Sequence, residues 1–288
     1  MDFRDSQPVA ERTVGYLGPH GTHSEEIALD LYREEARRFI PFQSIDGAMR
    51  AVENGIVTEC VVPIENSLEG PVNITLDTLA HEVNLVIIKE IVWSVRHHLF
   101  MKSGTPQIDV IVSHSQALAQ CRNYISRCHP GVDLKAVEST AEAACIVAKA
   151  SQNYAAIGST RAGQIFGLQP VAADIQDSDK NCTRFVVLSK QQDLVQGGRC
   201  KTSVICQMKG EKPGSLCDML QEFAVRDVNL TRIESRPAKT GLGEYIFFLD
   251  VEGSMAEDKV RSAVTAVQLK SRRFKNLGSF HVATLKNL

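Results

Sequence analysis

Residues 13–190 alternate short apolar runs with helical patterns, and this alternation limits the possible folds more than any other feature of the chain. The run at residues 13–17 reads as a strand. It leads into a helix that carries Ile27, Ala28 and Leu31 on one face. Such alternation predicts an α/β domain with a mostly parallel sheet. Further strands are predicted at residues 60–64, 84–95, 108–112, 154–157 and 184–188.

Several of the predicted helices begin at a Ser or Thr that suits a cap. A Glu or Gln follows three residues after Thr22, Ser113 and Ser139, which is the pattern of a capping box. Another helix opens at Ser44 and closes at Gly55. Helix starts offer free N–H groups and a favourable dipole to an anion, although ordinary capping also accounts for each of these corners.

A polar stretch with a Gly pair at residues 191–200 separates residues 13–190 from a smaller unit at residues 201–288. In the smaller unit the predicted elements follow the order βαββαβ, which is ferredoxin-like. Its strands are predicted at residues 204–208, 228–235, 244–251 and 280–284, and its helices at residues 216–223 and 260–267.

The composition describes a globular protein without a charge surplus. The chain has 288 residues, a net charge of -2 and 43% hydrophobic residues, which fits roughly two domains with a sizeable core. Without a basic surplus we expect neither a nucleic-acid partner nor an anionic membrane surface. No apolar run is long enough to span a bilayer, and the polar residues 1–8 read as a frayed tail and not as a signal peptide.

The 8 Cys residues indicate a reducing compartment. None is spaced Cys-x-x-Cys, so we expect no structural zinc. Several, such as Cys60, Cys145 and Cys206, lie on apolar faces and are interpreted as small buried hydrophobic residues. We therefore expect a cytoplasmic protein.

Two polar tracts lie beside predicted strands. Residues 65–70 follow an apolar strand directly, and open α/β sheets bind ligands beyond their strand ends. Thr183 stands between a polar run at residues 177–181 and a strand. Composition alone also allows a plain interpretation of each tract. Residues 65–70 would then be a surface loop. Thr183 would be an ordinary residue before a strand, and Arg184 would be the partner in a surface ion pair.

Taken together, the tracts resemble the prephenate dehydratases of the monofunctional bacterial type, which end in an ACT domain. The resemblance runs from Gly15 to Leu285. Its catalytic motifs are Gly-Pro-x-Gly-Thr-x-Ser at residues 18–24, Pro-Ile-Glu-Asn-Ser-x-Glu-Gly at 63–70, Ser-His-x-Gln-Ala-Leu-x-Gln-Cys at 113–121, Ser-Thr-Ala at 139–141 and Thr-Arg-Phe at 183–185. Its ACT motifs are Pro-Gly-Ser-Leu at residues 213–216 and Glu-Ser-Arg-Pro at 234–237. Each motif is weak alone, but their shared order is specific.

The resemblance implies a hydro-lyase of L-phenylalanine biosynthesis that converts prephenate to phenylpyruvate, carbon dioxide and water without a cofactor or metal. It implies a two-lobed catalytic domain at residues 13–190, similar to periplasmic binding proteins, a linker at residues 191–200 and a ferredoxin-like ACT regulatory domain at residues 201–288. Hinge closure over a cleft between the lobes is then the expected conformational step.

The residues that the resemblance assigns to catalysis are Thr183, Glu65, Asn66, Ser113 and Gln120. Thr183 would hydrogen-bond or protonate the departing hydroxyl, and it needs polarising neighbours because a hydroxyl is a weak acid. Glu65 is either the proton source or an acceptor that orients Thr183. The implied substrate-binding residues are Thr22, Ser24, Ser67, Thr75, Ser139, Thr140, Arg184 and Phe185. Arg184 is equally interpreted as the partner of a substrate carboxylate or as a buried structural arginine.

In the ACT domain the family binds L-phenylalanine at a subunit interface, as a feedback inhibitor. The implied effector residues are Pro213, Gly214, Ser215, Leu216, Asn229, Leu230, Glu234, Ser235, Arg236 and Pro237. Gly214 and Ser215 open a helix, so their N–H groups suit the carboxylate of an amino acid. The alternative is a helix start beside an empty pocket. ACT units pair side by side, so we expect a homodimer or a homotetramer.

Two residues depart from the family pattern, since Ser115 replaces a Pro and His23 replaces an aromatic residue. Neither replaces a residue that the family uses for chemistry. Three rival functions remain open: an arogenate dehydratase, a prephenate decarboxylase that does not aromatise its product, and a non-catalytic amino-acid sensor on the same scaffold. Retention of the catalytic set speaks against the last two.

Overall fold

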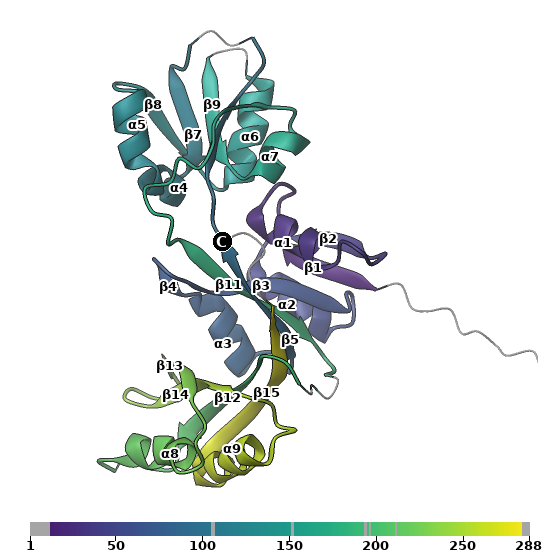
Figure 1. The fold of residues 1–288 in the computed structure, drawn as a ribbon, viewed down its shortest axis with the longest axis vertical. Helices are drawn as coiled ribbons and strands as arrows, with labels where there is room; N and C mark the ends of the chain where they lie inside the picture. The colour runs from purple at the N-terminus through teal and green to yellow at the C-terminus, as the bar shows by residue number, and fades with distance from the viewer. Residues whose placement is uncertain are drawn as a thin grey trace, which may run out of the picture.

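The computed structural model describes residues 12–104, 107–150, 153–192, 195, 197–210 and 212–283. The tail predicted at residues 1–8, Thr284 at the end of the last predicted strand and part of the predicted linker lie outside these residues. The described chain forms an upper lobe, a central lobe and a C-terminal unit at the bottom of Figure 1. A ten-stranded sheet runs through the lower two, and a five-stranded sheet forms the upper lobe.

The central lobe holds six strands of the ten-stranded sheet. Its strands are β1 (Thr13–Leu17), β2 (Arg38–Phe42), β3 (Glu59–Asn66), β4 (Gly70–Pro71), β5 (Val86–Ser94) and β11 (Cys182–Ser189), in the order β5-β11-β3-β1-β2 with β4 beside β3. Helix α1 (His23–Leu31) covers one face, where Ile27 and Ala28 pack on Val14 and Tyr16. Helices α2 (Ile45–Glu53) and α3 (Asn73–His81) cover the other face.

The upper lobe is built on the five-stranded sheet. Its strands are β6 (His98–Met101), β7 (Val110–His114), β8 (Asp133–Val137), β9 (Tyr154–Gly158) and β10 (Gln169–Ala172), in the order β10-β6-β9-β7-β8. Its helices are α4 (Ser115–Gln120), α5 (Arg122–Cys128), α6 (Thr140–Lys149) and α7 (Thr160–Ile165). The chain crosses between the lobes at residues 95–97 and returns at residues 173–181. This is the two-lobed α/β arrangement that the sequence predicts.

The prediction of a mostly parallel sheet is wrong, because both sheets are mixed. β1 lies parallel to β2 and β3, and β7 lies parallel to β8 and β9. β11 instead runs antiparallel to both β3 and β5. β11 is the segment that returns from the upper lobe, so it enters between its two neighbours from the opposite end.

The C-terminal unit has the predicted βαββαβ order. Its elements are β12 (Cys200–Met208), α8 (Ser215–Ala224), β13 (Leu230–Pro237), β14 (Tyr245–Glu252), α9 (Asp258–Lys270) and β15 (Ser271–Ala283), with the strands in the order β13-β14-β12-β15. Helices α8 and α9 pack on one face of these strands. The other face adds Ile205, Phe248 and Leu277 to the core that holds Leu76 and Leu79 of α3. β15 also pairs with β5, so one sheet joins the unit to the central lobe.

Most predicted helix starts are confirmed. The side chains of Thr22, Ser44 and Ser139 accept backbone N–H bonds at the starts of α1, α2 and α6. The prediction for Ser113 is wrong, because His114 caps α4 and the Ser113 hydroxyl donates to a carbonyl of the neighbouring strand. Strands β2, β4, β6, β8 and β10 are missing from the sequence prediction. β2, β8 and β10 lie at sheet edges and contain no buried residue, so no buried apolar run marks them.

All eight cysteines are free thiols. The predicted burial is confirmed for Cys60 and Cys206, whereas Cys145 is only half-buried. Within the described ranges, no helix combines the length and apolar character that a bilayer span needs.

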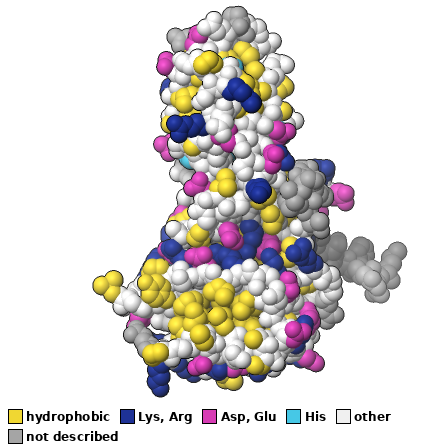
Figure 2. Space-filling view, turned by 60° about the vertical axis from the view of Figure 1, so that its left-hand side comes forward, with side chains coloured by type: hydrophobic (Ala, Val, Ile, Leu, Met, Phe, Trp, Pro, Cys, Tyr) yellow, Lys and Arg dark blue, Asp and Glu magenta, His cyan; other side chains and the backbone are white. Residues whose placement is uncertain are grey.

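A cluster of buried charges joins the central lobe to the C-terminal unit. Arg184 of β11 contacts Asp250 of β14 at 2.5 Å and Glu90 of β5 at 3.3 Å. Lys201 also contacts Glu90, and the Ser203 hydroxyl donates to Asp250. Burial disfavours the charged form of Asp250, but the Arg184 guanidinium and the Ser203 hydroxyl outweigh it and lower the pKa of Asp250. Figure 2 shows a belt of charged side chains at this level, above a hydrophobic face of the C-terminal unit.

Replacing Arg184 by Leu should lower the free energy of unfolding by about 3–5 kcal/mol, because two buried carboxylates lose a partner. The lowered pKa of Asp250 means that its ionised form stabilises the fold above about pH 4, and that this contribution is lost as the pH falls further. The difference in the free energy of unfolding between the wild type and the variant, measured with urea, should therefore become smaller below about pH 4.

The control for this variant is Arg33→Leu, which removes an exposed ion pair with Asp30. It should leave the unfolding midpoint near that of the wild type, because exposed pairs contribute little. An Arg184→Leu variant as stable as the wild type would contradict a structural role for this arginine.

Candidate active site

A cavity of about 450 Å³ lies between the two lobes. Its walls come from the start of α1, the end of β3, the start of β11, helix α4 and the start of α6. Eight of the predicted catalytic and substrate-binding residues line it: Thr22, Ser24, Asn66, Gln120, Ser139, Thr140, Thr183 and Phe185. The fold thus brings together motifs that lie far apart in the sequence.

Asn66 and Thr183 face the cavity because of how β3 and β11 pair. They stand opposite each other in the antiparallel register, and Glu65 and Arg184 form the next pair. The register then skips one residue of β3, which is a β-bulge. Side chains alternate along a strand, so Asn66 and Thr183 point into the cleft while Glu65 and Arg184 point to the opposite side.

The amide of Asn66 has one orientation that satisfies its neighbours. Its Oδ1 accepts the backbone N–H groups of Leu68 and Glu69 at 2.9 and 3.0 Å. Its Nδ2 therefore faces the cleft, where it donates to Thr183 Oγ1 at 2.8 Å and to Asn181 Oδ1 at 3.0 Å. A hydroxyl that accepts such a bond keeps its own proton for another partner, so the Thr183 O–H is free to donate into the cavity.

The series of hydrogen bonds continues into the upper lobe. Asn181 Nδ2 donates to Gln120 Oε1 at 2.9 Å, and Nε2 of His97 lies 2.9 Å from the same oxygen. Because that oxygen is an acceptor, His97 must donate from Nε2, and the NH2 group of Gln120 is left for the cavity. This polar chain joins β3 of the central lobe to α4 of the upper lobe.

His97 is neutral around pH 7. Burial is the main cause that lowers the pKa of His97 to about 4, and the neighbouring His23 lowers it further, although the bond to Gln120 acts in the opposite direction. The two rings meet edge to face, with 5.9 Å between their centroids. A neutral ring with its proton on Nε2 is the form that the bond to Gln120 requires.

Helix starts, and not cationic side chains, favour an anion in this cleft. None of its lining residues in the described part of the chain is Lys or Arg. Helices α1 and α6 both begin at the cavity, where Thr22 and Ser139 cap them. The other N–H groups of their first turns have no partner within the helix, and together with the helix dipole they favour a carboxylate.

Glu65 and Arg184 lie outside the cavity lining. The Glu65 carboxylate contacts Arg184 at 3.4 Å and Arg232 of β13 at 3.2 Å, on the side of β3 that faces the C-terminal unit. Arg184 is buried in the charge cluster described above. Of the two interpretations of Arg184, the geometry supports the structural one, and it separates Glu65 from Thr183.

Ser113, Ser67 and Thr75 also lie outside the lining. Ser113 is bonded within the upper sheet. The Ser67 hydroxyl bridges the backbone of residues 180 and 182 at 2.8 and 2.9 Å, and the Thr75 hydroxyl donates to the backbone of Pro63 at 2.6 Å. These hydroxyls hold the strands that carry the cleft and do not face it.

The cavity has further lining residues that the sequence analysis left out: Glu69, His97, His114, Gln116, Glu138 and Asn181. Asn181 ends the polar run before Thr183, and His114 and Gln116 stand inside a family motif, so the sequence did hold signals for them. His97 lies in a stretch without a motif, and only its contacts in the fold reveal it.

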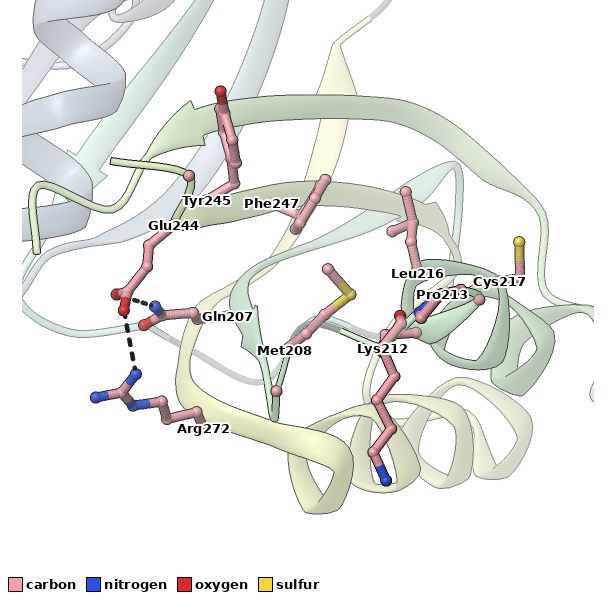
Figure 3. A pocket seen from close by; sticks show the side chains of 14 residues that line it. Gln207, Met208, Lys212, Pro213, Leu216, Cys217, Glu244, Tyr245, Phe247 and Arg272 are labelled. Atoms are coloured by element: carbon pink, nitrogen blue, oxygen red, sulfur yellow. Dashed lines mark hydrogen bonds and ion pairs between the residues drawn. The ribbon is translucent and has the colours of Figure 1, made fainter. Parts of the chain in front are cut away.

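A second cavity, of about 520 Å³, opens in the C-terminal unit (Figure 3). The predicted effector residues 213–216 line it at the start of α8. Met208 and Phe247 provide an apolar floor between this loop and a polar end, where Glu244 contacts Gln207 at 3.2 Å and Arg272 at 3.6 Å. The cavity therefore has one apolar and one charged region.

The start of α8 is open toward this cavity. Gly214 precedes the helix with a left-handed φ of 87°, a conformation that favours glycine. No side chain caps the helix, so the backbone N–H groups of Leu216 and Cys217 have no capping partner.

The other predicted effector residues lie apart from this cavity. Asn229 and Leu230 line a third cavity of about 620 Å³, at the opposite end of α8. Residues 234–237 lie on β13, where Arg236 contacts Asp77 and Asn73 of α3. Within one chain the predicted effector residues thus form separate groups.

Comparison with known proteins identifies the class of enzyme that this fold and cleft define. The sequence profile of prephenate dehydratase matches residues 14–193, which include both lobes. The chain therefore belongs to the prephenate dehydratase family, as its motifs suggest.

Relatives extend the match to the C-terminal unit. A prephenate dehydratase of Methanocaldococcus jannaschii is 37% identical, covering 94% of this chain and 98% of the relative. A chloroplastic protein of Arabidopsis thaliana named arogenate dehydratase/prephenate dehydratase 2 is 38% identical, covering 94% of this chain and 73% of the relative. The crystal structure of a prephenate dehydratase from Arthrobacter aurescens in complex with L-Phe is 33% identical, with a TM-score of 0.85 over 93% of this chain and 89% of that one.

Proposed function

We propose that this chain is a prephenate dehydratase, a hydro-lyase that forms phenylpyruvate in L-phenylalanine biosynthesis. The observation that carries the proposal is the Thr183 hydroxyl, which lies in the cleft of a family member and accepts a bond from Asn66 at 2.8 Å while its own proton is free. The cavity of about 450 Å³ has room for a small dianion.

The reaction releases one group as carbon dioxide and another as water. The bond between the ring and its carboxylate breaks, and its electron pair moves into the ring as the C–O bond of the ring hydroxyl breaks. The oxygen leaves as hydroxide, and a proton from the solvent converts it to water. Thr183 donates a hydrogen bond to this oxygen, and the bond from Asn66 polarises the Thr183 hydroxyl and makes it a better donor.

The remaining cleft residues hold the substrate in this proposal. The free NH2 group of Gln120 donates to a substrate oxygen, and Phe185 supplies an apolar wall for the ring. The helix starts at Thr22 and Ser139 place backbone N–H groups against the two carboxylates. Aromatisation supplies the driving force, so the enzyme mainly holds the dianion and assists the departure of the hydroxyl group.

Glu65 is not the proton source in this proposal. Two arginines contact its carboxylate on the far side of β3, away from the cavity. Thr183 is therefore the donor that contacts the departing oxygen.

An arogenate dehydratase is the second candidate, and one observation favours it. Glu69 and Glu138 line the cleft, whereas no Lys or Arg is found among its described lining residues. The ammonium group of arogenate would find acidic partners there that the keto group of prephenate does not need. The ratio of kcat/KM for the two substrates separates the candidates, and a non-catalytic sensor would turn over neither.

We further propose that the C-terminal unit is an ACT domain in which L-phenylalanine acts as a feedback inhibitor. The carboxylate of the amino acid meets the N–H groups at the start of α8, which no side chain caps. In this proposal its ring packs on Met208, Leu216 and Phe247, and its ammonium group pairs with Glu244. Figure 3 shows these four side chains around the cavity.

A second copy of the chain best accounts for the other effector residues. β13 is one of the two edge strands of the ten-stranded sheet, and Ile233 on it is 47% exposed. An open edge strand suits pairing with the same strand of another copy. We therefore propose a homodimer or homotetramer in which residues 234–237 of one copy approach the effector cavity of the next.

The proposed domains are a catalytic domain at residues 13–190, a linker at 191–200 and the ACT domain at 201–288. The start of β12 at Cys200 supports this division. The eight free thiols support a cytoplasmic location.

Thr183→Val should lower kcat for phenylpyruvate formation by about 100-fold or more, because the departing oxygen loses its donor. Thr183→Ser keeps a hydroxyl and should retain much of the activity. Phenylpyruvate is followed by its absorbance in alkali. Glu65→Gln changes a side chain outside the cleft and should reduce kcat far less than Thr183→Val.

Full activity in Thr183→Val together with a collapse of kcat in Glu65→Gln would reverse the assignment of these two residues. An absence of phenylpyruvate from the wild-type protein would overturn the proposed reaction, and arogenate is then the substrate to test.

Glu244→Gln should raise the concentration of L-phenylalanine that gives half-inhibition by about tenfold, because the ammonium group loses a charged partner. The matched control is Glu34→Gln in the exposed turn after α1, which lines none of the cavities described and should keep wild-type sensitivity. Inhibition is measured on initial rates with prephenate. If L-phenylalanine does not change the turnover of the wild type, the proposed effector is refuted and the proposed reaction still stands.

A further inference from the structure

His97 is a buried polar residue to which neither the motifs nor the proposed reaction assign a role. It lies after β5, in the first crossing between the lobes, and is 4% exposed. Its Nε2 donates to Gln120 Oε1 at 2.9 Å. Its Nδ1 is buried and has no hydrogen-bond partner among the described residues.

A purely structural histidine does not account for this arrangement. A buried polar atom without a partner destabilises a fold by about 1–3 kcal/mol, which an apolar side chain of similar size would avoid. The backbone holds the crossing segment, since His97 N–H donates to Gln176 Oε1 at 3.0 Å and its carbonyl accepts from Ile175 N–H at 2.9 Å. The hydrogen bond of the imidazole itself goes to Gln120.

Gln120 gains a fixed orientation from this bond. An amide oxygen has two lone pairs, and here Asn181 occupies one and His97 the other. If the Gln120 amide rotated by half a turn, its NH2 group would meet two donors and lose both bonds. With both donors in place, the NH2 group stays aimed at the cavity.

We propose that His97 is a positioning residue, whose neutral ring locks the Gln120 amide so that the NH2 group points at the substrate. This inference rests on the proposed function, in which Gln120 binds a substrate oxygen. His97 acts through Gln120 and is not assigned a contact with the reacting atoms.

The surroundings of His97 keep its ring in the required form. Within the described chain, the titratable groups that act on it are His23 of α1 and His98 of β6, and each disfavours a proton on the ring. Glu26 lies on the far side of His23, 3.5 Å from the Nδ1 of that ring. His23 stands where the family has an aromatic residue, and its ring packs edge to face against His97.

The test compares His97→Leu with His97→Gln in the full chain, with prephenate as substrate. A Gln side chain places an N–H donor near the position of Nε2, and a Leu side chain has none. His97→Leu should lower kcat/KM by about tenfold or more, and His97→Gln should restore most of it. Thermal unfolding of each variant reports on the fold.

A double variant separates positioning from a general loss of structure. In a Gln120→Leu background, His97→Leu should cause no further loss of kcat/KM, because its effect passes through the missing amide. Equal losses in the presence and absence of Gln120 would overturn the proposal, as would a His97→Gln variant that is folded and as slow as His97→Leu.

A further readout does not depend on turnover. Proton–nitrogen NMR of the histidine rings, with the His97 signals identified by their loss in His97→Gln, should show a neutral ring with its proton on Nε2 from about pH 5 to about pH 8. A proton on Nδ1 would overturn the proposal even if the Leu variant failed to fold. Absence of wild-type turnover would instead refute the proposed reaction and leave this test in force.

Discussion

The side-chain amide of Asn66 sets the direction of the hydrogen bonds across the cleft. The backbone of Leu68 and Glu69 donates to its oxygen, so its nitrogen must face Thr183 and Asn181. Each further side chain in this series of hydrogen bonds can then act only as an acceptor or only as a donor toward its neighbour. The free proton of Thr183 and the free NH2 group of Gln120 both follow from two backbone N–H groups in the turn after β3.

The two faces of β3 and β11 serve different purposes. On one face Asn66 and Thr183 line the cleft, and on the other Glu65 and Arg184 meet Arg232 and Asp250 of the C-terminal unit. On each of these two strands, one residue therefore lines the cleft and its neighbour contacts the C-terminal unit, at the junction between that unit and the central lobe. The strands that hold Thr183 therefore contact the C-terminal unit directly, through the ion pairs of this junction.

The strands and helices with clear periodicity could be predicted from the sequence, and so could the βαββαβ order of the C-terminal unit. The division of the site residues between the two strand faces could not. The motifs name Glu65 beside Asn66 and Arg184 beside Thr183, but adjacent residues of one strand face opposite sides. The β-bulge in β3 and the insertion of β11 between β3 and β5 decide which side is the cleft, and both depend on contacts between distant segments.

The most direct test of this account is the position of the protons in the cleft, observed by neutron crystallography of the deuterium-exchanged protein. The account predicts two deuterons on the side-chain atom of Asn66 that faces Thr183, and a Thr183 deuteron that points into the cavity. A Thr183 deuteron directed at Asn66, with the oxygen of that amide facing it, would contradict the orientation on which the proposed reaction depends.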